Sequence, residues 1–241
     1  MARPCLAWLC VAALLSRGAA AAGDEAASHA AARFGPEQLP AVSDADDPLV
    51  DASLVVPGLL VQLAYATSQN ITGHALYPPD ARCLLRKSIA ERLAGVAHAL
   101  EPRGLRLVAW DCARPHAAQE ALFRAHPHPG AVADPKRGSL HERGVAIDLA
   151  LADREGKLVA LPTGFDAFGP RAAADAALPA GREKENRDLL ITAMNSAGFR
   201  PNPKEWWHFS RLYGFRWPPV REAMMWTAPS AALRAAEPAA K

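Results

Sequence analysis

A histidine and an aspartate in the stretch GSLHERGVAID, residues 138–148, have side chains that bind metal ions. His141 offers an imidazole and Asp148 a carboxylate, and both groups are good ligands for zinc. Their separation of seven residues is odd, so a straight strand would point them to opposite faces, whereas Gly144 allows a bend between them. A charged residue within an apolar strand is costly unless it is paired or bound to a cation. The pair is therefore either half of a metal site or part of a polar loop that runs into a strand.

The stretch EWWH, residues 205–208, could complete such a site. Together with the earlier pair, His208 would give three ligands and leave the fourth position of zinc open for water, which is the composition of a catalytic site. Glu205 could take a proton from that water and later pass it to a leaving amine. Trp206 and Trp207 could exclude water from the site, although we expect at least one of them to pack in the core.

The stretch WDCARPH, residues 110–116, places Arg114 between an apolar run and a proline that can begin a helix. A cation at the end of a strand, facing a zinc site, would stabilise the oxyanion of a tetrahedral intermediate. The alternative is an exposed arginine that pairs with Asp111, and this stretch alone favours that alternative.

These residues must be positioned by a mixture of helices and strands. Helices are predicted over residues 87–104, 116–125 and 183–199. The first has apolar residues at helical spacing, the second follows a proline, and a glycine ends the first and the third. Strands are predicted over residues 59–66, 105–110, 144–151 and 205–210. The order does not alternate strictly, so we predict an α+β fold with a small, mainly antiparallel sheet flanked by helices. The chain contains no GxGxxG, P-loop, GxSxG or HExxH motif.

Taken together, the motifs resemble those of the D-alanyl-D-alanine dipeptidase family, the VanX-like zinc peptidases of peptidase family M15. SLHERGVAID fits the family motif S-x-H-x-x-G-x-A-x-D, and EWWHFS fits its E-x-W-H motif. WDCARP is similar to W-D-x-Y-R-P, and LAYATSQNITG is similar to an early Y-A-T-x-x-N-F-T-G stretch. The resemblance runs from about residue 55 to 217, with the motifs in the family's order.

This resemblance implies a hedgehog/DD-peptidase-like zinc fold and a role for each motif residue. The implied zinc ligands, for one Zn²⁺ per chain, are His141, Asp148 and His208. The implied catalytic residues are Glu205 as general base and Arg114 as transition-state stabiliser. The implied substrate contacts are Ser139 for the substrate carboxylate, Asp166 for its amino terminus and Tyr65 for the pocket wall. Ala113 and Ile71 stand where the family usually has tyrosine and often has phenylalanine, and these departures concern the shape of the pocket.

The expected activity is zinc-dependent hydrolysis of the dipeptide D-Ala-D-Ala to two D-alanines. Zinc-bound water, activated by Glu205, would attack the peptide carbonyl, and zinc and Arg114 would stabilise the oxyanion. One alternative is a DD-carboxypeptidase or endopeptidase that cuts longer peptidoglycan peptides. A second alternative is a non-catalytic zinc-binding domain, against which the presence of both Glu205 and Arg114 argues.

The N-terminal residues 1–22 have the layout of a secretory signal, with a charged start, a short apolar run and small residues at the end. We therefore expect an exported protein without a stable membrane anchor, and the family resemblance implies that its compartment is the bacterial periplasm. A flexible lead-in over 23–48, a zinc dipeptidase domain over 49–226 and a flexible tail over 227–241 complete the predicted organisation. The formal net charge is +2, and the sequence contains no cluster of basic residues of the kind that binds nucleic acid.

Four cysteines are present, and removal of the signal would leave Cys83 and Cys112. Two cysteines in an oxidising compartment often pair, and this bridge would join the start of a helix to the end of a strand. The alternative is two free buried thiols.

Overall fold

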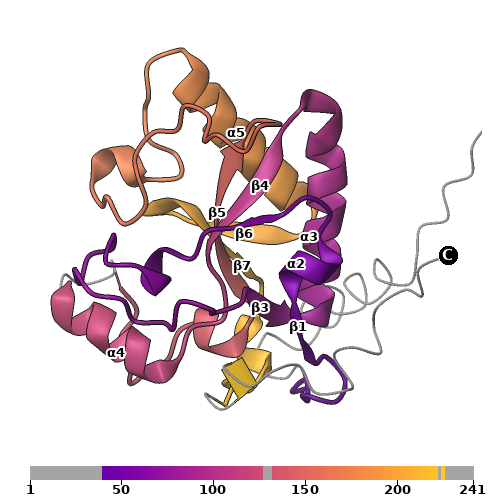
Figure 1. The fold of residues 1–241 in the computed structure, drawn as a ribbon, viewed down its shortest axis with the longest axis vertical. Coiled ribbons are helices and arrows are strands. Elements are labelled where there is room, and N and C mark those ends of the chain that lie inside the picture. The colour runs from indigo at the N-terminus through magenta and orange to yellow at the C-terminus, as the bar shows by residue number, and fades with distance from the viewer. Residues whose placement is uncertain (1–39, 127–131, 222–223, 226–241) are drawn as a thin grey trace, which may run out of the picture. The chain divides into compact units, whose positions relative to one another are not determined.

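The computed structural model describes residues 40–126, 132–221 and 224–225 (Figure 1). The predicted signal, most of the predicted lead-in and the predicted tail lie outside these residues. Within the described ranges, no helix has the length and apolar character that a membrane crossing requires.

A five-stranded sheet forms the centre of the fold (Figure 1). Its strands, in spatial order, are β2 (Leu60–Val61), β4 (Arg106–Asp111), β5 (Ala146–Ala152), β7 (Glu205–Arg211) and β6 (Phe199–Asn202). β2 pairs with β4 in parallel, and the other neighbours are antiparallel, so the predicted mainly antiparallel sheet is confirmed. A separate two-stranded sheet pairs β1 (Leu49–Asp51) with β3 (Leu84–Arg86).

The helices are α2 (Ala52–Val55), α3 (Lys87–Leu100), α4 (His116–Ala125) and α5 (Arg182–Ser196). α3 and α5 lie together, and their buried residues join the strands in the main core, whereas α4 lies across the strands from them in Figure 1. The α+β class is therefore confirmed. Short 3-10 turns connect these elements; the two that bear on the site are η2 (Ala64–Ala66) and η4 (His141–Arg143).

The three predicted helices form close to the expected residues. In α3, the apolar residues at helical spacing, Ile89, Leu93, Val96, Ala97 and Leu100, are all buried, as an amphipathic helix on a core requires. After α3 and a 3-10 turn over Glu101–Arg103, Gly104 takes the left-handed conformation with φ 70°, which favours glycine and ends the helical run.

The prediction of a strand over 59–66 is largely wrong. Only Leu60–Val61 pair with β4, and Ala64–Ala66 form a 3-10 turn. The backbone carbonyl of Tyr65 accepts hydrogen bonds from the N–H groups of Leu76 and Tyr77 at 2.7 and 3.0 Å. The alternating pattern suggested that this segment continues as a strand. Instead, the chain folds back after Val61, and the Tyr65 side chain is buried in the core.

The end of the predicted lead-in, residues 40–48, is packed against the domain. Asp47 is buried, and its carboxylate accepts hydrogen bonds from the Ser88 amide, from the Ser88 hydroxyl at 2.6 Å and from the Trp217 indole at 2.8 Å. Val42 donates from its amide to the carbonyl of Arg216, and Arg216 donates from Nε to the carbonyl of Pro40. This segment therefore differs from the expected flexible one, because a buried carboxylate and backbone pairing hold it.

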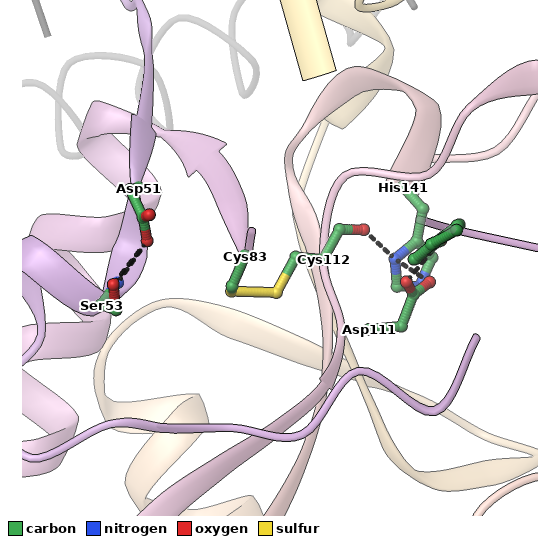
Figure 2. The surroundings of a disulfide bond; sticks show 7 residues. Asp51, Ser53, Cys83, Asp111, Cys112 and His141 are labelled. Carbon is green, nitrogen blue, oxygen red and sulfur yellow. Dashed lines mark hydrogen bonds and ion pairs between the residues drawn. A yellow bond between two sulfur atoms is a disulfide. The ribbon is translucent and has the colours of Figure 1, made fainter. Parts of the chain in front are cut away.

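Cys83 and Cys112 form a disulfide (Figure 2), with their Cα atoms 5.2 Å apart. Cys83 directly precedes β3, which leads into α3, and Cys112 directly follows β4. The bridge therefore joins the two sheets at the places the sequence suggested, with the short strand β3 between Cys83 and the helix.

Candidate active site

The three predicted metal ligands converge in the structure. Asp148 in β5 and His208 in β7 are register partners on neighbouring antiparallel strands, which places their side chains on one face. His141 begins the turn η4, and Gly144, with φ 68°, ends that turn and redirects the chain into β5. Nδ1 of His208 lies 3.0 Å from Oδ1 of Asp148 and 3.0 Å from Nε2 of His141.

The spacing of these three atoms suits a zinc ion. Nε2 of His141 lies 3.4 Å from Oδ1 of Asp148, which closes the triangle. Ligand atoms about 2.0–2.2 Å from a tetrahedral zinc lie about 3.3 Å from one another. Although burial raises the pKa of Asp148, the neighbouring His141 and His208 hold it below its ordinary value, so the carboxylate is in its anionic form. Two imidazoles and an anionic carboxylate form the donor set of a catalytic zinc site.

The other ring nitrogen of His141 fixes which nitrogen faces this cluster. Nδ1 lies 2.8 Å from the backbone carbonyl oxygen of Cys112 and 3.3 Å from Oδ2 of Asp111 (Figure 2). A carbonyl oxygen can only accept, so Nδ1 carries a hydrogen, and Nε2 is the ring nitrogen that faces the cluster. A neutral imidazole in this tautomer is the form that binds a metal.

Glu205, the predicted general base, opens β7 beside the cluster. Its Oε2 lies 3.8 Å from Nδ1 of His208 and accepts a hydrogen bond from the side-chain amide of Asn202 at 2.9 Å. The β6–β7 register shifts between Pro201 and Asn202, so Asn202 pairs with Glu205 and brings its amide to the carboxylate. Burial raises the pKa of Glu205 to about 7, against the opposing effect of His208, and this value suits proton transfer near neutral pH.

Arg114 is paired with Asp111, yet it is buried. Only 7% of Arg114 is exposed, and Nε and Nη2 donate to Oδ2 of Asp111 at 2.9 and 2.8 Å. Nη1 donates to Gln119 in α4 at 2.7 Å. Nη2 also lies 3.7 Å from Oδ2 of Asp148, so the guanidinium is fixed beside the predicted metal ligands. The pairing with Asp111, which the sequence suggested as the alternative to a catalytic role, therefore holds the cation in the site.

Asp111 is a site residue that the sequence analysis treated only as a surface partner. It is fully buried at the end of β4, and its Oδ1 accepts a hydrogen bond from the Tyr77 hydroxyl at 2.7 Å. It is the register partner of Asp148, which is in turn the partner of His208, so three polar side chains form one row across three strands. The available signal was its position directly after an apolar strand, where an unpaired carboxylate would be costly.

Asp166 and Tyr65, which the resemblance assigned to substrate binding, contact each other. The Tyr65 hydroxyl donates to Oδ1 of Asp166 at 3.2 Å. Asp166 has φ 55°, which is unusual for a residue other than glycine. Among the described residues, its Oδ2 is buried without a hydrogen-bond partner. Burial, followed by the charge of Asp148, raises the pKa of Asp166 to about 7. An unpaired buried carboxylate of this kind is suited to receive an ammonium group.

Ser139, the predicted contact for the substrate carboxylate, lies in the loop before η4. Its backbone N–H donates to Oε2 of Glu142 at 2.5 Å, and its hydroxyl accepts from the amide of His141 at 3.2 Å. The serine is thereby tied to the loop that carries His141, the first predicted metal ligand.

All of these predicted residues line one cavity of about 270 Å³. Its walls include the following side chains: Tyr65, Arg114, Ser139, His141, Asp148, Asp166, Glu205, Trp207, His208 and Phe215. The volume is near the lower end of the range for ligand sites, which suits a small substrate. Neither Ala113 nor Ile71, the two departures from the family motifs, is among the described residues that line it.

The two tryptophans of EWWH are both buried, and only Trp207 lines the cavity. Trp206 donates from its indole nitrogen to the hydroxyl of Thr163 at 2.9 Å and packs edge-on against Trp110. The expectation that at least one of them packs in the core is confirmed.

The sequence matches a family model and three named proteins. A sequence model of the D-Ala-D-Ala dipeptidase family matches residues 45–214. The D-alanyl-D-alanine dipeptidase of Escherichia coli (strain K12) is 41% identical over 161 residues, which cover 67% of this chain and 83% of that protein. The D-alanyl-D-alanine dipeptidase of Enterococcus faecalis (strain ATCC 700802 / V583) is 29% identical over 168 residues, or 61% and 83% of the two chains. A third dipeptidase of that name, from Enterococcus faecium, is 28% identical over 178 residues, or 64% and 87%.

Proposed function

This chain belongs to the D-Ala-D-Ala dipeptidase family, a family of metallopeptidases, and from this premise we propose that it hydrolyses the dipeptide D-Ala-D-Ala to two D-alanines with one Zn²⁺. The observation that carries the proposal is the convergence of Nε2 of His141, Oδ1 of Asp148 and Nδ1 of His208 within 3.4 Å of one another. Glu205 and Arg114 lie at the same cavity, so a base and a cation accompany the ligands.

The three converging atoms would hold the zinc ion. When bound, Zn²⁺ supplies Lewis-acid activation of a water nucleophile and of the scissile carbonyl. Because Nδ1 of His141 is committed to the Cys112 carbonyl, the ring enters this set with only one nitrogen free to ligate.

Glu205 performs the proton transfers. Its carboxylate takes a proton from the attacking water and returns it to the nitrogen of the leaving D-alanine. A pKa raised to about 7 by burial lets the carboxylate both accept and release a proton near neutral pH. Asn202 binds Oε2, and none of the described residues makes a hydrogen bond to Oε1, so Oε1 is the oxygen that receives the proton.

Arg114 stabilises the negative charge that develops on the carbonyl oxygen. A guanidinium has five N–H groups, and the bonds to Asp111 and Gln119 leave a second hydrogen on both Nη1 and Nη2. Because these bonds fix the group before the substrate arrives, little reorganisation accompanies the reaction.

Two further contacts hold the charged ends of the dipeptide. Asp166, whose Oδ2 is free among the described residues, pairs with the substrate ammonium, and Tyr65 orients that carboxylate. Ser139 contacts the substrate carboxylate. Binding both ends orients the scissile bond and limits the length of the substrate, which argues against longer peptidoglycan peptides.

The test is to compare hydrolysis of D-Ala-D-Ala with hydrolysis of N-acetyl-D-Ala-D-Ala, which lacks the ammonium group. We expect kcat/KM for the free dipeptide to be at least about tenfold higher, because a charge-assisted pair is lost in the acetylated substrate. A chelator should abolish the activity and added Zn²⁺ should restore it. Faster cleavage of the acetylated substrate would favour a carboxypeptidase, and zinc binding without hydrolysis would favour a non-catalytic domain.

The same proposal includes an export route and a hedgehog/DD-peptidase-like fold. The layout of residues 1–22 supports secretion to the bacterial periplasm, where the Cys83–Cys112 disulfide is chemically favoured. Measuring the mass of the protein from a periplasmic extract would show whether the segment is removed.

A further inference from the structure

Cys112 connects the disulfide directly to a proposed metal ligand. Its side chain is bonded to Cys83, and its backbone carbonyl oxygen lies 2.8 Å from Nδ1 of His141 (Figure 2). Both cysteines are almost completely buried, with 0% and 1% exposed. The covalent bond and the hydrogen bond therefore meet in a single residue.

The regular β-ladder does not fix the position of this residue. The β4–β5 register shifts between Ala109 and Asp111, and the last ladder pair joins Asp111 to Asp148. Cys112 comes after that pair, so its place depends on contacts outside the central sheet. The disulfide and the hydrogen bond from the Ala113 amide to the Leu84 carbonyl, at 2.9 Å, attach this part of the chain to β3.

β3 also holds the loop on the other side of His141. The amide of Arg86 donates to the carbonyl of Gly144 at 2.9 Å, directly after η4. The amide of Arg114 donates to the carbonyl of His141 at 3.1 Å. β3 is therefore hydrogen-bonded both to Ala113, directly after Cys112, and to Gly144, directly after η4. The disulfide adds a covalent bond between Cys112 and Cys83, the residue before β3.

We propose that the Cys83–Cys112 disulfide positions the metal ligand His141, so that its loss weakens zinc binding beyond any loss of stability. The bond holds the Cys112 carbonyl where it accepts from Nδ1 of His141, and this contact presets Nε2 toward Asp148 and His208. The proposal rests on the zinc site put forward under Proposed function.

The test is the zinc dissociation constant of a Cys83→Ala/Cys112→Ala double variant, measured by competition with a chelator at a temperature at which the protein is folded. Removing a group that orients a metal ligand commonly weakens metal binding about ten- to a hundredfold. Because the carbonyl itself remains and only its restraint is removed, we expect the dissociation constant to rise about tenfold.

A matched control separates positioning from stability. Leu100→Ala removes a fully buried side chain at the far end of α3, away from Cys83, and lowers the thermal stability through a cavity. We expect this variant to melt at a lower temperature and to bind zinc with unchanged affinity. A second double variant, Cys83→Ala/Cys112→Val, fills more of the buried space and serves if the first does not fold.

Different results would overturn different statements. If the wild type binds zinc and the double variant binds it equally well while melting lower, the disulfide has only a structural role and the inference is wrong. If Leu100→Ala weakens zinc binding as much as the double variant does, the effect is one of stability and the inference is also wrong. If the wild type does not bind zinc, the proposed metal site fails, and this inference fails with it.

Discussion

Two regions of the cavity are built in different ways. The proposed metal-ligand region, His141, Asp148 and His208, stands on paired strands and on a turn tied to them. The proposed amine-binding region, Asp166 with Tyr65, joins a loop to the 3-10 turn η2, and its two residues are 101 positions apart in the chain. Asp166 adopts the left-handed conformation and keeps a buried oxygen without a partner among the described residues.

The two regions therefore also differ in energy: the first is held in place by its own contacts, whereas the second is strained in the absence of substrate. In the proposed metal-ligand region the converging nitrogen and oxygen atoms contact one another and the Arg114 guanidinium lies beside them, so these buried polar groups stabilise one another. In the amine-binding region an unusual backbone angle and an unpaired oxygen cost stability in the absence of substrate. We therefore expect substitutions in the first region to act on the reaction rate and those in the second to act on substrate affinity and on pH dependence.

The largest effect is expected from Glu205→Gln. The amide cannot accept a proton from water, so kcat should fall about a thousandfold, within the usual range for loss of a general base. Zinc content should be unchanged, because Glu205 is not one of the three converging ligands. Steady-state kinetics and metal analysis check this, with Glu185→Gln on the exposed face of α5 as the matched control. A variant with nearly normal kcat would remove Glu205 from the mechanism.

The second-largest effect is expected on the affinity of the protein for its dipeptide substrate. Asp166→Asn removes the charge that pairs with the substrate ammonium, and hydrogen bonds to charged groups contribute enough to predict a rise in KM of about ten- to a hundredfold. Turnover of N-acetyl-D-Ala-D-Ala, which has no ammonium, should change little. Equal losses on both substrates would show that Asp166 shapes the cavity and does not recognise the amine.

The same substitution should increase stability at alkaline pH. The pKa of Asp166 is about 7 in the folded protein, against an ordinary value of 3.8, so the folded state binds the proton more tightly than the unfolded state. Wild-type stability therefore falls as pH rises from 3.8 to about 7, and remains lower above that pH. A pKa difference of about three between the folded and the unfolded state corresponds to at most about 4 kcal/mol, so we expect the Asp166→Asn variant to be more stable than wild type by about 1–4 kcal/mol at a pH of about 8, with most of the difference gone at a pH of about 4. Urea unfolding of the metal-free proteins at both pH values checks this, and a wild type that is the more stable protein at the higher pH would contradict it.

The smallest effect is expected from Tyr65→Phe. The hydroxyl is lost, but the ring beside the Arg114 guanidinium remains. Loss of one hydrogen bond of ordinary strength predicts about a threefold rise in KM for the free dipeptide. The kcat should be unchanged, and a large fall in kcat would place Tyr65 with the metal-ligand region instead.

The sequence was most informative where a regular element sets the spacing. The amphipathic pattern of residues 87–104 predicted α3, whereas the resemblance to the family motifs, and not local spacing, implied that His141, Asp148 and His208 would meet. A ladder or helix converts sequence separation into a fixed distance, so such positions can be inferred locally.

The sequence was least informative where tertiary contacts decide the structure. β1 and β3 have three residues each and exist because they pair with each other, and the 59–66 pattern gave way to the hydrogen bonds at Tyr65. Asp111 belonged to a recognised motif, yet its role depends on the Tyr77 hydroxyl, which comes from 34 positions away, and on the turn that brings the nearby Arg114 back to its carboxylate. Neither the composition nor the periodicity of the sequence indicates these tertiary contacts.

The pairing of residues 40–48 with the segment around Trp217 brings the two ends of the described domain together. Pro40 and Arg216 share a hydrogen bond of 2.7 Å, although they are 176 positions apart. A short linker could therefore join these ends, and the domain is a candidate for circular permutation or for insertion as a unit into a surface loop of another protein.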